Sequence, residues 1–365
     1  MTNLLEAMKT RNDLDTAQVD DVIIATGDPV NEQGSNLAKT AINYSSWDAV
    51  TTGAQIHRYC AGALDAVNVS AAKVMAGMED LVCGGGVESL SRVGMGASGG
   101  AITDPAVQMK SLFISQGLGA DLMASLDGFT REDVDRYALM SQVRAAHARD
   151  NGYFKSLVPV VDFNGVTILD HDELIRETSI ESLASLKPSF KMFNDFGHGD
   201  VARLRYPQIE EIDNIHTPGN SSGIVDGAGL VLLGNKAAGY AQGLKPRARI
   251  VSFATTGSEP TIMLAGPVPA TQKALKKAGM TMNDIDLVEL NEAFASVVLR
   301  FQRELNVEDE RINVNGGAIA MGHPIGATGA MILGVLLDEL ENLKYWPEKV
   351  KFMQKNLIGK SYGCE

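Results

Sequence analysis

Cysteine is scarce in this sequence, with three in 365 residues, and long apolar runs are missing. Three cysteines cannot build a disulfide framework, and they fit a reducing compartment where thiols stay free, so we expect a cytoplasmic protein. No run of about eighteen apolar residues occurs, so the sequence predicts no membrane span. The chain also opens without a basic segment followed by an apolar core, and we expect no signal peptide.

Basic residues are outnumbered by acidic ones, with 32 Lys and Arg against 45 Asp and Glu and a net charge of −13. Such a chain is a poor candidate for coating nucleic acid, because phosphate binding needs a basic surface. We therefore expect no nucleic-acid partner, although a local basic pocket for a small phosphorylated ligand is allowed. No Cys/His spacing resembles a zinc site, and no metal is expected.

Glycine, in contrast, is abundant, with 37 residues. The glycines gather in clusters rather than in a Gly/Ser tract, which indicates tight turns and close backbone approaches instead of a flexible linker. The clusters lie at residues 83–86, 94–100, 219–229 and 316–329.

Short β-branched runs alternate with helical patterns, which is typical of an α/β fold. Strands are expected at 20–26, 80–83 (with a glycine turn after it), 225–233, 248–254 and 285–290, and helices at 4–11, 64–78, 131–149 and 327–337. Between about 87 and 215 the pattern loosens, which indicates an inserted loop domain. An acidic turn followed by a buried strand occurs at 15–26 and again at 281–290, so the chain is predicted to contain two related halves.

Cys60 is the first candidate for chemistry. It stands at or just before the start of a helical pattern, where unpaired N–H groups and the helix dipole favour a thiolate. Placement alone leaves two interpretations open, a nucleophile or an inert buried cysteine. For Cys83, which precedes three glycines at an expected strand end, the packing interpretation is favoured.

His323 differs from the other histidines. The remaining five have polar or charged neighbours and are expected at the surface; they are His57, His147, His171, His198 and His216. His323 lies in NVNGGAIAMGHPIGATGA, where flanking glycines let the backbone pass close to a ligand. A histidine there can act as base for a nearby thiol, or it is simply a turn residue.

Two further segments carry candidates. NEAFA, which begins at Asn291, follows an expected strand directly and fits the ligand-binding edge of an α/β sheet. A second interpretation, compatible with the first, is that Asn291 caps a helix with Glu292 in its first turn. The loop HTPGNSSGIVDGAG, residues 216–229, either lines a narrow tunnel with small residues or is only a tight loop.

These four segments, in this order, resemble the thiolase family of acetyl-CoA acyltransferases over roughly residues 4–342. The resemblance implies an α/β fold in five layers, αβαβα, with two related halves and an inserted loop domain. The first half would span residues 1–90 and resume at about 216–250, the loop domain 91–215, and the second half 251–365. The insertion at 193–215 and the GNSSG motif look more like the degradative thiolases.

The resemblance also implies an activity: cleavage of a 3-ketoacyl-CoA by CoA to acetyl-CoA and a shortened acyl-CoA, or the reverse Claisen condensation. Cys60 matches the nucleophile that becomes acylated. His323 matches the histidine that activates it, and Asn291 the residue that holds a water in the oxyanion hole. Covalent catalysis with preorganised oxyanion donors suits this reaction.

Substrate binding and assembly follow from the same resemblance. Ser222, together with the adjoining Gly223, matches the serine that touches the pantetheine arm, and Arg176 an arginine near CoA in some relatives. CoA and acyl-CoA are substrates, so no resident cofactor is expected. Relatives form homodimers or homotetramers with their central sheets paired, and a β-oxidation partner subunit is a further expected type of contact.

Both ends depart from the family pattern. The family's opening strand has no counterpart before the first helix, and after about residue 342 the sequence loses the Gly triplet and the second, acid/base cysteine of the family. Cys364 is the only cysteine in that stretch, outside the pattern. An alternative is therefore a catalytically impaired, thiolase-like acyl-CoA-binding protein or partner subunit. A ketoacyl synthase is disfavoured, because Asn291 stands where a second catalytic histidine is usual.

Overall fold

The computed structural model describes residues 1–342, so Cys364 and the expected differences in the tail lie outside it. Its main sheet has four strands in the order β2-β1-β3-β6. β1 is parallel to both neighbours, with Ile23 opposite Ala54 and Gly84, and β6 is antiparallel to β3. The strands are β1 (Asp21–Ala25), β2 (Thr52–Ile56), β3 (Leu81–Ser89) and β6 (Asp226–Gly234).

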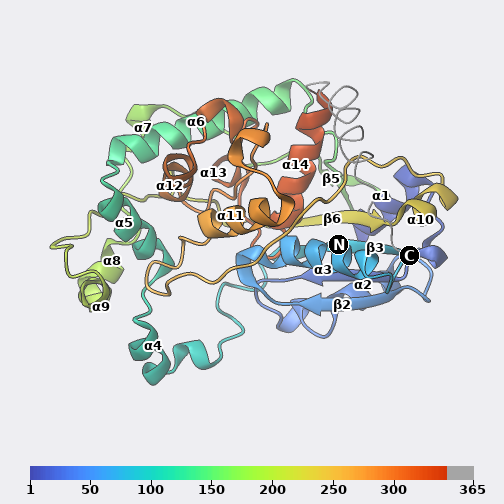
Figure 1. The fold of residues 1–365 in the computed structure, drawn as a ribbon, viewed down its shortest axis with the longest axis horizontal. Helices are drawn as coiled ribbons and strands as arrows, with labels where there is room; N and C mark the ends of the chain where they lie inside the picture. The colour runs from blue at the N-terminus through green and yellow to red at the C-terminus, as the bar shows by residue number, and fades with distance from the viewer. Residues whose placement is uncertain (343–365) are drawn as a thin grey trace.

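Helices cover both faces of this sheet (Figure 1). α3 (Gly62–Met75) and α14 (Thr328–Asn342) contact each other and the strands β3 and β6. α2 (Leu37–Tyr44) packs against β1 and β2 and touches α1 (Thr2–Asn12). An apolar core that includes Leu5, Ile24, Ile42 and Cys83 joins α1 and α2 to the sheet. The two ends of the described chain thus meet on one sheet.

The glycines after Cys83 do not form the predicted turn, because β3 continues through them to Ser89. A β-carbon on Gly85 would stand 2.1 Å from the carbonyl oxygen of Gly229, and one on Gly86 1.8 Å from that of Gly326. The absence of side chains therefore lets two other segments approach the strand's backbone. Close approach, the alternative that glycine clusters also indicate, is the correct interpretation here.

Within residues 1–342 the second half does not form the two strands expected at 248–254 and 285–290. A single parallel bridge joins Val288 to Ile312. The N–H and carbonyl of Leu290, which a sheet ladder would pair, bond instead to the side chain of Asn313 at 2.8 and 2.9 Å. Backbone polar groups need partners when they leave water, and here side chains supply them.

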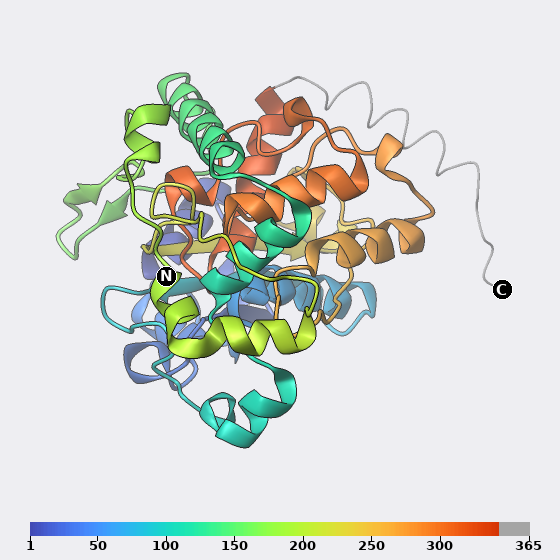
Figure 2. The same cartoon turned by 90° about the vertical axis from the view of Figure 1, so that its left-hand side faces the viewer.

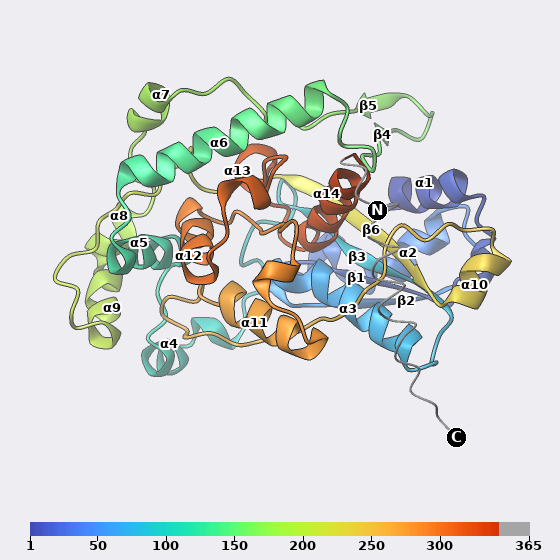
Figure 3. The same cartoon turned by 45° about the horizontal axis from the view of Figure 1, so that its top comes forward.

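Helices dominate this half of the molecule. α12 crosses beneath the long helix α6 (Figures 1 and 3), and both contribute to a second apolar core with Val134, Phe301 and Ile319. Besides α14, the helices of this half are α11 (Pro267–Ala278), α12 (Ala295–Leu305) and α13 (Ala318–Met321). α10 (Lys236–Ala241) belongs to the first half, where Ala238 packs against the core at the main sheet.

The predicted loop domain, residues 91–215, contains mostly helices and one small hairpin. Figure 2 shows α4 standing away from the rest of the molecule. α6 contacts α12 and α13, whereas the hairpin β4–β5 lies beside α1, where Asn3 bonds to Val161. The elements are α4 (Pro105–Ser111), α5 (Gln116–Asp127), α6 (Arg131–Asp150), β4 (Val160–Val161), β5 (Thr167–Leu169), α7 (Ile180–Ala184), α8 (Lys191–Phe193) and α9 (Gly199–Arg205). The proposed domain boundaries stay a prediction.

Among the helices described for residues 1–342, none combines the length and apolar character needed to cross a bilayer.

Candidate active site

Cys60 lies at the carboxyl edge of the main sheet, just beyond β2. It belongs to a short 3-10 helix, Tyr59–Ala61, that leads directly into α3. Tyr59 adopts a left-handed backbone with a φ of 44°, which is uncommon for a residue with a side chain. The carboxyl ends of parallel strands are where α/β sheets bind ligands, and strain of this kind often accompanies functional sites.

The thiol of Cys60 is not the thiolate that its position before a helix led us to expect. Burial is the main cause that raises its pKa to about 11, and the negative charge of Glu88 contributes to the same rise. Desolvation disfavours the charged form of a thiol, and here it outweighs the N–H groups of the helix start. At neutral pH the group is protonated, so a base must remove the proton before Cys60 can attack a substrate.

The hydrogen bonds of His323 decide which of its ring nitrogens carries the proton. Its Nδ1 lies 2.6 Å from the hydroxyl oxygen of Thr328, which itself donates to the carbonyl of Pro324 at 3.0 Å. Since the hydroxyl has one proton, it accepts from Nδ1–H, and the free lone pair stays on Nε2. The amide nitrogen of Asn291, 3.4 Å from Nε2, fits the same assignment as a weak donor.

Burial also keeps the His323 ring uncharged. The side chain is 7% exposed, and desolvation lowers its pKa from 6.5 to about 4. A neutral imidazole with its lone pair on Nε2 can accept the thiol proton, which a charged imidazolium could not.

Asn291 precedes α12 but does not cap it. The helix begins at Ala295 with Phe294 as the capping residue, so the cap interpretation is wrong. The amide oxygen of Asn291 is buried and has no hydrogen-bond partner. A buried polar atom left unpaired is costly, and such an atom is satisfied when a water or a ligand binds. This orphan oxygen fits the water-holding role that the resemblance implies.

The start of α14 brings His323 to the helix that follows Cys60. A β-carbon on Gly329 would lie 2.3 Å from the backbone nitrogen of Leu64, so the two helices meet at their first turns. α14 also contacts the short helix that contains Cys60. The sequence-predicted nucleophile and base, 263 positions apart, therefore share one corner of the molecule.

Ser222 and Gly223 thread between the segments of Asn291 and His323. The N–H of Ser222 donates to the carbonyl of Ala293 at 3.0 Å, and the carbonyl of Gly223 accepts from the N–H of His323 at 2.8 Å. The loop is thus part of the same site. The loop is closely packed, since a β-carbon on Gly219 would lie 2.6 Å from the side chains of Leu183 and Leu186, and the tunnel interpretation stays a prediction.

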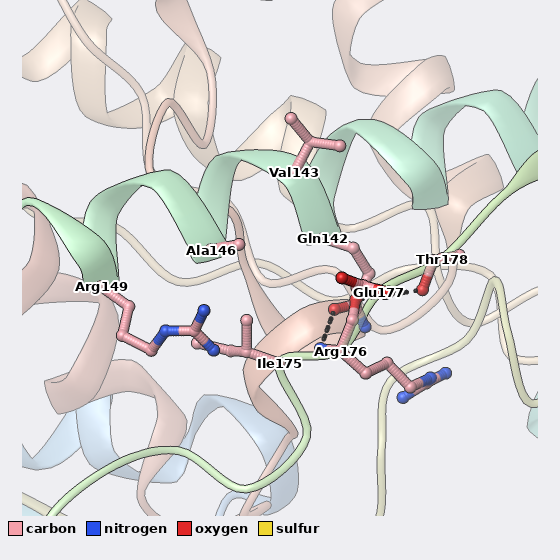
Figure 4. Close-up of a pocket in the computed structure, with 8 residues that line it drawn as sticks. All are labelled: Gln142, Val143, Ala146, Arg149, Ile175, Arg176, Glu177 and Thr178. Carbon is pink, nitrogen blue, oxygen red and sulfur yellow. Dashed lines mark hydrogen bonds between the residues drawn. The ribbon is translucent and has the colours of Figure 1, made fainter.

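Arg176 stands at the rim rather than at this centre. It is exposed and helps to line a pocket of about 620 Å³ between α6 and the segment that follows β5 (Figure 4). The side chain of Leu174, two residues earlier, fills the space next to the α-carbon of Gly223. Arg149 lies across the pocket but pairs with Asp150 at 2.8 Å. Arg176 is therefore the better placed of the two to meet an anion.

Sequence reasoning missed Glu292 as a structural centre of the site. Its fully buried carboxylate accepts hydrogen bonds from the hydroxyls of Tyr137 and Ser141, both at 2.7 Å, and from the N–H of Ile319 at 3.0 Å. Burial raises its pKa, while the same donors oppose that rise. The expected place in the first turn of a helix is wrong, since Glu292 joins α6 and α13 to the segment of Asn291.

Two other expectations have clear outcomes. His216 is not at the surface: it is fully buried, and its Nδ1 lies 2.7 Å from a carboxylate oxygen of Asp121. The carboxylate of α5 offsets the cost of burying the ring, which charged neighbours in the sequence did not indicate. Cys83 is confirmed as a packing residue in the sheet core.

No cluster of three or more His, Cys, Asp or Glu side chains in residues 1–342 is arranged to hold a metal ion.

Comparison with known proteins identifies the family. Two family models match: the thiolase N-terminal domain over residues 1–199 and the thiolase C-terminal domain over residues 244–345. The 3-oxoadipyl-CoA/3-oxo-5,6-dehydrosuberyl-CoA thiolase of Escherichia coli is 37% identical over 351 residues, 90% of this chain and 82% of the relative. A 3-ketoacyl-CoA thiolase of Shewanella loihica is 38% identical over 348 residues, 93% and 85% of the two chains.

A solved structure is similar as well. The crystal structure of human mitochondrial 3-ketoacyl-CoA thiolase matches with a TM-score of 0.80 and 30% identity, covering 94% of this chain and 86% of the human one. The fold and the site thus define a thiolase-like acyltransferase. The chain belongs to the thiolase family.

Proposed function

We propose that the chain transfers acyl groups between 3-ketoacyl-CoA and CoA through an acyl-Cys60 intermediate. The observation that carries this proposal is the neutral, correctly oriented His323 at the corner of the molecule where Cys60 also lies. The names of relatives at 37% and 38% identity agree with this class of substrate.

The reaction divides into two steps. First, the Cys60 sulfur gives its proton to Nε2 of His323 and bonds to the keto carbon of the substrate. The bond between the keto and α carbons then breaks, and acetyl-CoA leaves after its α carbon takes the proton that Cys60 gave to His323, which returns the imidazole to its neutral form. Second, the thiol of CoA attacks the acyl thioester, which releases the shortened acyl-CoA and returns a proton to Cys60. Two easier steps replace one difficult step.

Asn291 and the loop beside it serve this chemistry in the proposal. A water held by Asn291, or the amide itself, stabilises the oxyanion that forms at the attacked carbon. Ser222 and Gly223 line the path of the pantetheine arm, and Arg176 meets a phosphate of CoA at the rim. CoA is a substrate here, so no resident cofactor is required.

We also propose a cytoplasmic homodimer, as the shortage of cysteine and the shape of the sheet suggest. β2 is one of the two edge strands of the sheet, and within residues 1–342 no strand pairs with its outer edge. Such an edge is a template for pairing with a second chain. The nearby Tyr44, Val50 and Tyr59 are 77%, 66% and 54% exposed, which adds apolar area for contact. Dimers could pair further into tetramers.

A thiolysis assay tests the function. The purified chain is mixed with CoA and acetoacetyl-CoA or a longer 3-ketoacyl-CoA, and loss of the ketoacyl-CoA is followed. Wild type should turn over, Cys60→Ala should be inactive, and Cys83→Ala should retain activity because Cys83 lies in the sheet core.

Equal turnover by wild type and Cys60→Ala would overturn the proposed nucleophile. A folded wild type that binds acyl-CoA without turnover would instead favour the impaired acyl-CoA-binding protein or partner subunit. Light scattering of the same preparation, with a predicted mass of two or four chains, tests the assembly.

A further inference from the structure

Glu88 is a buried carboxylate to which the reaction above gives no role. It is 1% exposed and stands near the carboxyl end of β3, next to the ends of the parallel strands β1 and β2. Its Oε2 accepts hydrogen bonds from the backbone N–H groups of Gly27, at 2.5 Å, and Gly326, at 2.7 Å. Its Oε1 accepts from the side chain of Gln33 at 2.6 Å.

These bonds join three segments that are far apart in the sequence. Gly27 follows β1, Glu88 belongs to β3, and Gly326 lies three residues after His323. The contact is too close for side chains, since a β-carbon on Gly326 would lie 2.5 Å from the α-carbon of Thr26. One carboxylate oxygen therefore fixes the loop after His323 against the edge of the sheet.

The same carboxylate lies close to the segment of the nucleophile: a β-carbon on Gly62, two residues after Cys60, would stand 2.6 Å from the side chain of Ala25, and Gly27, two residues after Ala25, donates to Glu88. In agreement with this geometry, the charge of Glu88 raises the pKa of the Cys60 thiol. A negative charge beside a thiol disfavours the thiolate, so the thiol stays protonated until a base takes the proton. Glu88 thus acts on both members of the pair: on His323 through the backbone and on Cys60 through the electric field.

We propose that Glu88 is a positioning residue that holds the His323 loop against the sheet edge beside Cys60, so that proton transfer and acylation are coupled. The inference rests on the proposed function only for its acylation arm. It predicts that removing the charge makes the thiol more reactive toward a simple alkylating agent and less reactive toward acyl-CoA.

Two substitutions separate charge from geometry. Glu88→Gln keeps the size of the side chain but removes the charge. Its NH₂ group cannot accept a hydrogen bond, so one of the donors that now bond to the carboxylate loses its acceptor. Glu88→Asp keeps the charge but is too short to reach all three donors. Asp121→Asn is the matched control: Asp121 is also fully buried and also accepts backbone N–H bonds, from Ile215 and His216, but in α5.

The experiment has two readouts on each full-length protein. The first is the rate of alkylation at Cys60 by iodoacetamide as a function of pH, with peptide mapping to exclude Cys83 and Cys364. The second is the initial rate of Cys60 acetylation by acetyl-CoA. At a pH well below the titration midpoint of the Cys60 thiol, the alkylation rate follows the thiolate fraction. A tenfold faster alkylation therefore corresponds to a titration midpoint about one pH unit lower.

For Glu88→Gln we expect alkylation at pH 8 to be several-fold faster than in wild type. We expect acetylation to be at least about tenfold slower, because a general base contributes about 10²–10⁴-fold to a rate and a misplaced base loses much of that contribution. Glu88→Asp should slow acetylation without making alkylation faster. Asp121→Asn should change neither the alkylation rate nor the acetylation rate. The proposal is overturned if Glu88→Gln leaves the alkylation profile in place, or if both rates fall together as in a loosened fold.

The two proposals can fail separately. If wild type itself is not acetylated, the proposed function fails, and the alkylation profile of Glu88→Gln still decides on Glu88: a shifted profile supports its position beside Cys60, and an unshifted one contradicts it.

Discussion

The two regions that meet at the candidate active site provide hydrogen-bond partners for their backbone groups in different ways. The region around Cys60 pairs its backbone in a four-stranded sheet, whereas the region around Asn291 and His323 has isolated bridges in residues 1–342, between Val288 and Ile312 and between Ser221 and Phe294. Side chains replace the ladder there: Asn313 bonds both backbone groups of Leu290, and Glu292 accepts the N–H of Ile319.

The difference teaches where each region is vulnerable. In the sheet region, close backbone contact depends on glycines, which have no side chain, so substitutions that add a side chain should lower the stability most. In the other region, the hydrogen bonds of the backbone depend on a few buried polar side chains, so substitutions that remove one of these side chains should lower the stability most. The predictions below test this contrast.

The largest effect is expected for Gly86→Ala. Its new β-carbon would stand 1.8 Å from the carbonyl oxygen of Gly326, and neither backbone can move without breaking the sheet or the His323 loop. We expect a loss of about 4 kcal/mol in the free energy of unfolding, or no folded protein. Urea unfolding measures it.

Gly94→Ala is the control for that substitution, because nothing lies within 4 Å of its β-carbon position. Its unfolding free energy should stay within about 1 kcal/mol of wild type. Equal stability of Gly86→Ala and Gly94→Ala would break the comparison on the sheet side.

Glu292→Ala tests the other region. It leaves the hydroxyls of Tyr137 and Ser141 and the N–H of Ile319 without their acceptor in the core. Each unsatisfied buried group costs about 1–3 kcal/mol, and partial relaxation leads us to expect a loss of about 3 kcal/mol. Glu292→Gln should lose less, since its amide oxygen still accepts some of these bonds.

The exposed Glu310 provides a matched control, and Glu310→Ala should stay within about 0.5 kcal/mol of wild type in the same urea titration. A Glu292→Ala protein as stable as Glu310→Ala would show that the region does not depend on its buried carboxylate.

A smaller, pH-dependent effect is expected at His323. Its pKa is lowered from 6.5 to about 4 in the folded protein, so the unfolded chain binds the extra proton between these values. Stability from the neutral ring is therefore present above pH 6.5 and is lost as the pH falls toward 4, by about 2–3 kcal/mol. His323→Asn should lose that much less between pH 7.5 and pH 4.5 than wild type does.

Global changes cancel in this difference, because both proteins share every other titrating group. Parallel pH profiles for wild type and His323→Asn would mean that the ring titrates alike in both states, and the buried neutral base would be contradicted.

The sequence was sufficient for much of this, through local patterns. Residues 20–26 and 225–233 predicted β1 and β6, and the helical periods gave α1, α3, α6 and α14 within a few residues. Cys60 and His323 were selected as candidates because they stand at a helix start and in a glycine-rich turn, and Asn291 because it directly follows an expected strand; their roles stay predictions. The family resemblance, which the comparisons confirm, then supplied their relation to one another.

The predictions that were wrong concern features that depend on contacts between residues far apart in the sequence. The pKa of Cys60 is set by burial and by Glu88, 28 positions away, which no local pattern encodes. The burial of His216 depends on Asp121 in another helix. The extended runs at 248–254 and 285–290 look like strands in sequence, but a strand forms only where a partner is aligned with it.

The central claim is that the two regions form one acylation site around Cys60, and intact-protein mass spectrometry after mixing with acetyl-CoA tests it most directly. We predict a single acetyl adduct on wild type and on Cys83→Ala, none on Cys60→Ala, and a much slower one on His323→Asn. A folded wild type without the adduct, or an adduct that forms equally fast on His323→Asn, would contradict the claim.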